Sequence, residues 1–67
     1  MFVEELRCII PANTQIQIRN KQGYLLVFGE NGSAETAYDK VPVKALCPVT
    51  SFDPSLPKIL PVIQIEV

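Results

Sequence analysis

Hydrophobic residues recur with two different periods in the first third of the chain. Over residues 2–10 they follow one another at spacings of three and four, which places them on one face of a helix. Ile16 and Ile18 instead alternate with polar residues over 14–19, the pattern of a half-buried strand. Pro11 separates the two segments because the residue before a proline avoids helical dihedral angles. The pattern therefore predicts a short helix over 2–10 and a strand over 14–19.

A second strand is predicted over 24–29, directly after a hairpin loop. Gly23 supplies the positive φ that such a loop requires. The segment 24–29 is apolar at nearly every position, so we expect both of its faces to be covered. The helix covers one face, and either the C-terminal half of the chain or a second molecule covers the other.

The middle of the chain is marked by turn residues and prolines. Asn31 and Gly32 indicate a turn, after which residues 34–39 form either a short helix capped by Ser33 or an irregular loop. A third strand is predicted over 41–47, beginning at a sheet edge because Pro42 cannot donate a ladder hydrogen bond.

The last third combines a proline-rich segment with a second alternating pattern. Residues 48–58 are predicted to form an irregular connection with a turn at 53–55. Residues 59–67 are predicted to form a strand with Ile63, Ile65 and Val67 on one face.

These elements predict an α+β fold in a single small domain spanning residues 1–67. The expected architecture is a four-stranded, mostly antiparallel sheet or a partly open barrel, with a short N-terminal helix. The chain is 48% hydrophobic and 19% charged, and a domain of this length buries only part of its apolar surface. We therefore expect self-association as a homodimer through apolar strands whose edges are open. The candidate surface is formed by Tyr24, Leu26, Phe28, Ile63, Ile65 and Val67.

The net charge of the chain and the composition of its first residues indicate where the protein acts. The net charge of −1 argues against a nucleic-acid-binding footprint, and no apolar run has the length of a membrane span. The start of the chain is acidic and lacks the basic segment of a signal peptide. We therefore expect a cytoplasmic location, in which Cys8 and Cys47 stay reduced.

Candidate catalytic residues do not form a recognisable constellation. The chain has no His, and Glu4 and Glu5 diverge on a helix, so neither general acid–base catalysis nor a metal or cofactor site is expected. Asp39 and Asp53 lie in turn-like contexts, where Asp normally bonds to its own backbone, so structural or solvated roles are expected for both. Cys8 and Cys47 are interpreted as small buried hydrophobic residues, with a disulfide or a reactive thiol as alternatives.

Residues 3–29 and 59–67 resemble a recurring type of small, uncharacterised reading frame found in phages and mobile elements of Gram-positive bacteria. The resemblance is carried by Glu4, Glu5, Leu6, Ile9, Ile10, Pro11, Asn13, Thr14, Ile16, Ile18, Asn20 and Gly23. The proline-rich middle departs from that pattern. The resemblance implies a genomic neighbourhood, and it is compatible with an inhibitor of a host system.

The sequence thus predicts a small non-enzymatic binding or regulatory protein that acts through protein–protein contacts. Its partners would be a second copy of the chain and a host protein. The alternative is a nucleic-acid-binding accessory domain on a small β-barrel, which would require a basic stripe on one exposed face. That stripe would join Arg19, Lys21, Lys44 and Lys58.

Overall fold

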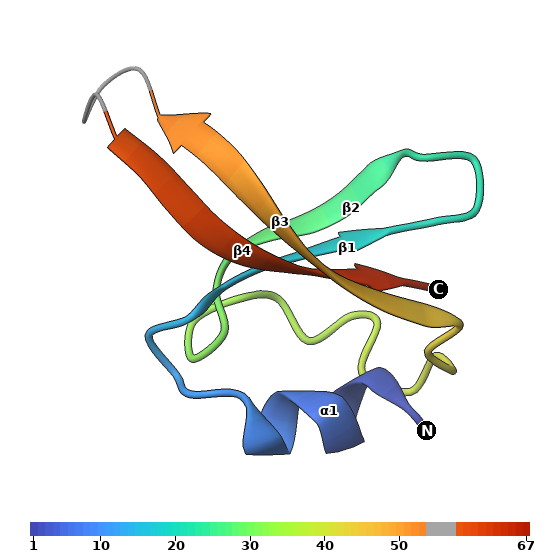
Figure 1. Cartoon of the computed structure of the whole chain (residues 1–67). Helices are drawn as coiled ribbons and strands as arrows, with labels where there is room; N and C mark the ends of the chain where they lie inside the picture. Colours follow the sequence, from blue (N-terminus) through green and yellow to red (C-terminus); the bar gives the residue numbers. More distant parts are fainter. Residues whose placement is uncertain (54–57) are drawn as a thin grey trace.

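The computed structural model describes residues 1–53 and 58–67, and for residues 51–53 and 58–60 it describes the backbone alone. Within these residues the chain forms one helix and a four-stranded sheet that does not close (Figure 1). The elements are α1 (Val3–Ile9), β1 (Gln15–Arg19), β2 (Leu25–Glu30), β3 (Ala45–Asp53) and β4 (Lys58–Glu66). The predicted α+β class is confirmed, and of the two predicted architectures the open sheet is the one observed.

The strand order across the sheet is β2-β1-β4-β3. The pairs β1/β2 and β3/β4 are antiparallel, whereas β1 and β4 are parallel. A parallel pair needs a crossover, and here the crossover includes residues 31–44 and β3. The sheet is therefore mixed, with two antiparallel pairs joined by one parallel pair.

One face of the sheet carries the isoleucines that the alternating pattern predicts. Ile16 lies opposite Ile63 and Ile18 lies opposite Ile65, and paired residues project from the same face. We call this the helix face, because α1 and residues 31–44 lie beneath it in Figure 1. The core that these layers enclose consists of Val3, Leu6, Ile10, Ile16, Ile18, Val27 and Ile65.

The opposite face of the sheet is called the open face, because no helix or loop of the described residues lies over it in Figure 1. Its side chains form three rows that cross the sheet from β2 to β3. From the register, the rows are Leu25, Arg19, Glu66 and Ala45; then Phe28, Gln17, Gln64 and Cys47; then Glu30, Gln15, Val62 and Val49.

A β-bulge in the first hairpin interrupts the alternation of side chains along β2. Ile18 pairs with Val27 but Arg19 pairs with Leu25, so Leu26 has no partner on β1. A bulge of this kind bends its strand and redirects side chains. Leu26 accordingly packs against the core together with Val27, whereas Leu25 is 49% exposed. The positive φ predicted for Gly23 is confirmed at 87°.

The structure overturns the predicted boundaries of the third strand. Residues 41–43 precede β3, because their backbone bonds to the start of the chain instead: Val3 N donates to Val41 O, and Val43 N donates to Met1 O. Lys44 N already donates to Glu66 O on β4, directly before β3 begins. Residues 45–53 form β3, so the part of the predicted irregular connection before residue 54 is a strand. Pro48 fits there because β3 is an edge strand. The turn predicted at 53–55 lies mostly outside the described residues.

The expectation of an open edge on the C-terminal strand is wrong. β4 lies between β1 and β3 and pairs with both, so the strands β2 and β3 form the two edges. β3 and β4 extend the sheet sideways from β1, and in the part of the chain that the structure describes they do not cover the open face of β2 (Figure 1).

Ile65 is fully buried at the centre of the core, which allows a direct test of the fold. Replacement by Ala should lower the free energy of unfolding by about 3 kcal/mol, because it removes buried methyl groups and leaves a cavity. That loss is a large share of the roughly 3–10 kcal/mol expected for a chain of this length. Urea denaturation measures it.

Ile9→Ala is the matched control, since Ile9 is 73% exposed on α1. It should change the free energy of unfolding by less than about 0.5 kcal/mol. Equal effects of the two substitutions would contradict the assignment of Ile65 to the core.

Candidate functional site

The connection between β2 and β3 supplies hydrogen-bond partners to the start of α1. Of the two alternatives for residues 34–39, the irregular loop is observed: it contains turns in which Ala34 N donates to Glu30 O and Asp39 N donates to Thr36 O. The first N–H groups of a helix have no partner within the helix. Here Glu4 N donates to Asp39 O at 2.9 Å, as Val3 N does to Val41 O.

The same connection also supplies partners to the end of α1. Asn31 is 6% exposed, and its Nδ2 donates to the carbonyl oxygens of Arg7 and Ile10, each at 2.9 Å. Both carbonyls belong to the last turn, where a helix leaves acceptors unpaired. Gly32 then passes so close to Ala12 that a Cβ at position 32 would lie 2.9 Å from the Ala12 Cβ. Glycine is therefore required at this contact.

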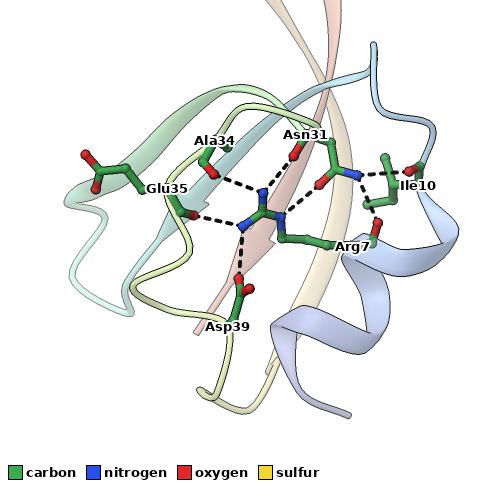
Figure 2. Close-up of polar contacts among 6 residues, drawn as sticks. All are labelled: Arg7, Ile10, Asn31, Ala34, Glu35 and Asp39. Carbon is green, nitrogen blue, oxygen red and sulfur yellow. Dashed lines mark hydrogen bonds and ion pairs between the residues drawn. The ribbon is translucent and has the colours of Figure 1, made fainter.

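The guanidinium of Arg7 joins α1 to the connection between β2 and β3 (Figure 2). Nε donates to Asn31 Oδ1 at 2.9 Å. Nη1 donates to Asp39 Oδ1 at 2.9 Å and to Glu35 O at 2.8 Å. Nη2 donates to Asn31 O at 2.6 Å and to Ala34 O at 3.1 Å. We call this group of residues, together with Ile10, the Arg7 cluster.

The Arg7 cluster is a structural device, since its polar groups are already used. An arginine has five N–H donors, and each of them has an acceptor here. The Arg7 side chain is only 10% exposed, and Asp39 balances its charge. The hollow beside it, of about 420 Å³, therefore offers an anionic ligand no free guanidinium donor. Asp39 has the structural role that was predicted, but its carboxylate accepts from Arg7, whereas a bond to its own backbone was expected.

A second ion pair links α1 to the same loop at the surface. Lys40 Nζ donates to Glu4 Oε1 at 2.7 Å, and the Lys40 side chain is 83% exposed. This hydrogen bond, assisted by the charge of Glu4, raises the pKa of Lys40 above its ordinary value. The ammonium therefore keeps its charge throughout the neutral range, and its solvent exposure makes the pair a weak one.

The interpretation of both cysteines as buried residues is wrong. Cys8 and Cys47 are both exposed, and neither forms a disulfide. Cys8 lies on α1, whereas Cys47 lies on the open face of β3. Within the described parts of the chain, His, Cys, Asp and Glu do not form a group of three that could hold a metal ion.

The six residues predicted to form the partner surface lie in different environments. Tyr24 is 70% exposed and Phe28 is 50% exposed, both on the β2 side of the sheet. Ile65 is fully buried, so the surface of this fold does not include it. The other three are half-buried against the core: Leu26, Ile63 and Val67. The structure thus brings only Tyr24 and Phe28 to an exposed apolar region, and it adds Leu25, which the sequence analysis did not select.

The centre of the open face holds a hydrogen-bonded pair of glutamines. Gln17 Nε2 donates to Gln64 Oε1 at 2.7 Å, and Gln17 is only 8% exposed because the neighbouring strands flank it. Phe28 lies beside Gln17, and Cys47 lies beside Gln64. The alternation in 14–19 predicted that Gln17 faces away from the core, but nothing in one strand predicts its partner on β4.

A hollow of about 540 Å³ lies where β3 and β4 extend past the start of β1. Its lining is largely apolar and includes Val49, Pro61 and Val62. Glu30 is the one ionisable side chain among the residues that line it. The described residues that line the hollow therefore do not supply the paired groups that proton transfer or nucleophilic attack would require.

Comparison of the chain with protein families, with curated proteins and with solved structures found no match. Among the residues that the structure describes, no helix has the length and apolar character needed to cross a membrane.

The structural role of Arg7 can be tested by a conservative substitution. Arg7→Lys keeps the charge but cannot reach the several acceptors that the planar guanidinium serves. It should lower the free energy of unfolding by about 3 kcal/mol, because buried acceptors lose their donors. Chemical denaturation at fixed protein concentration measures the change.

Lys21→Arg is the control exchange between the two basic residue types, because Lys21 is exposed in the hairpin loop, outside both the Arg7 cluster and the open face. It should change the free energy of unfolding by less than about 0.5 kcal/mol. An Arg7→Lys protein as stable as the wild type would contradict the role of the Arg7 cluster.

Proposed function

We propose that this chain is a small, non-enzymatic binding protein that acts through protein–protein contacts and forms a homodimer. The observation that carries the proposal is the set of exposed apolar side chains on β2 and directly before it: Tyr24, Leu25 and Phe28 are each between 49% and 70% exposed. Aromatic residues grouped on a surface in this way are typical anchors of protein interfaces.

The position of these side chains supports a flat protein partner in preference to a small ligand. Leu25 and Phe28 project from the open face of an edge strand. A flat sheet face that bears apolar residues is usually buried against another sheet or helix. The helix face is covered by α1 over its central strands, and Leu46 at its β3 edge is 53% exposed. The open face has no such cover on any strand in Figure 1, so it is the face that we propose a partner completes.

The nucleic-acid alternative is less well supported, because the net charge is −1 and the two basic residues outside the required stripe are engaged with acids. Arg7 pairs with Asp39, and Lys40 pairs with Glu4. Of the stripe that the alternative requires, Arg19, Lys21 and Lys44 are available, while the side chain of Lys58 lies outside the described residues. Binding of single-stranded and duplex oligonucleotides at two salt concentrations separates the two functions, since only the alternative predicts salt-sensitive affinity.

A cytoplasmic site of action fits the two exposed free thiols, Cys8 and Cys47, which a reducing compartment preserves. The resemblance of residues 3–29 and 59–67 to small phage and mobile-element reading frames makes a host protein the further partner in this proposal. The homodimer would then be the form that meets that partner.

The oligomeric state tests the proposal directly. Light scattering at high micromolar concentration should give a mass near twice 7.4 kDa. Phe28→Lys should give a folded monomer, because it places a charge where an apolar contact is expected.

Ile9→Lys is the matched control on the helix side, where Ile9 is 73% exposed. It should leave the dimer intact. A wild-type chain that is monomeric at high micromolar concentration would overturn the homodimer, and a dimeric Phe28→Lys protein would exclude the open face as its contact.

A further inference from the structure

We propose that the homodimer forms by face-to-face packing of two open faces, related by a two-fold axis that runs parallel to the strands between β1 and β4. This inference rests on the proposed function and specifies its geometry. Such an axis places each strand over its mirror position in the strand order. β1 then lies over β4 of the second copy, and β2 lies over β3 of the second copy.

The glutamine pair provides the first argument for a second copy as the occupant. The bond from Gln17 Nε2 to Gln64 Oε1 leaves the acceptor Gln17 Oε1 and the donor Gln64 Nε2, and the described contacts give neither atom a partner. The two-fold axis places Gln17 over Gln64 of the second copy. Each copy therefore offers the donor that the other needs, and the four side chains close a ring of hydrogen bonds.

The two charges in the first row of the open face are complementary in the same arrangement. Arg19 and Glu66 occupy the same row on β1 and β4. The axis brings Arg19 of one copy over Glu66 of the other, twice in the dimer. Packed sheets lie about 10 Å apart, a gap that an arginine and a glutamate can bridge from opposite sides. The row therefore gains two ion pairs and no like-charge contact.

On the outer strands, two large side chains lie over small side chains of the second copy. Phe28 on β2 lies over Cys47 on β3 of the second copy, and Leu25 lies over Ala45 in the same way. Cys47 and Ala45 are small and exposed, so they leave room for the half-exposed Phe28 and Leu25. Close packing of large against small side chains is how sheet faces fill the space between them.

An axis perpendicular to the strands would lose these matches. It would place Phe28 over Phe28 and Leu25 over Glu30 of the second copy, and it would leave Arg19 over Gln15. Of the two axes, the parallel one gives Gln17, Gln64, Arg19 and Glu66 complementary partners and places Phe28 and Leu25 over small residues. In the third row it places Gln15 over Val62 and Glu30 over Val49, so that row adds no matched polar pair.

A charge-reversal pair tests this register. Arg19→Glu and Glu66→Arg should each weaken homodimer formation at least about tenfold, because each variant places like charges opposite one another. When the two variants are mixed, residue 19 of each copy again faces an opposite charge at residue 66 of the other. The mixture should therefore form heterodimers, which native mass spectrometry detects when one variant is ¹⁵N-labelled.

Lys21→Glu is the matched control, since Lys21 is exposed in the hairpin loop outside the open face. It should dimerise like the wild type, and circular dichroism should confirm that all three variants are folded. Homodimerisation of both variants at wild-type affinity would overturn the face-to-face arrangement but leave the homodimer standing. Folded variants that do not combine on mixing would also overturn it. A monomeric wild type would overturn the proposed function as well.

A measurement on the wild-type chain keeps the test independent of any variant. Within one chain, Phe28 and Cys47 lie on opposite edge strands with β1 and β4 between them. An isotope-filtered nuclear Overhauser experiment on mixed labelled and unlabelled chains should connect the Phe28 ring to Cys47 across the interface. Intermolecular signals that arise only between β2 residues would show edge pairing and overturn the proposal.

Discussion

The helix face depends on one interaction, the contact between Arg7 and the loop that follows β2. α1 is seven residues long, and a helix of that length does not persist in water without tertiary support. The side-chain amide of Asn31 donates to two carbonyl oxygens at the end of α1. The carbonyl oxygens of Asp39 and Val41 accept from N–H groups at the start of α1. Arg7 holds this loop in place through five hydrogen bonds. Helix and loop therefore form one layer over the isoleucines of the sheet.

The local elements could be predicted from the sequence because they depend on periodicity and on single turn residues. The alternation around Ile16 and Ile18 predicted β1, and Gly23 marked its hairpin. The strand boundary at Ala45 was mispredicted because Val41 and Val43 bond to the first residues of the chain, a contact between distant segments. β3 extends through Pro48 because it lies at an edge, a position that no local pattern reveals.

The candidate site was predictable only in part, for the same reason. Phe28 was selected for its place in an apolar strand, but Ile65 has the same character and is buried, because β4 lies between two other strands. The bulge that separates Leu25 from Leu26 depends on the register with β1. Arg7 and Asn31 were not selected, since an arginine in a last helical turn and an asparagine before a glycine are both common without any shared role.

The central claim is that the Arg7 cluster closes one face of the sheet and leaves the other to a second copy. The most direct measurement follows side-chain NMR signals of the wild-type chain from high to low micromolar concentration. Our account predicts that the amide signals of Gln17 and Gln64 shift on dilution as the dimer separates, while the Nε–H signal of Arg7 stays unchanged and protected from solvent. Gln17 and Gln64 signals that do not move, or an Arg7 Nε–H that exchanges freely with water, would contradict it.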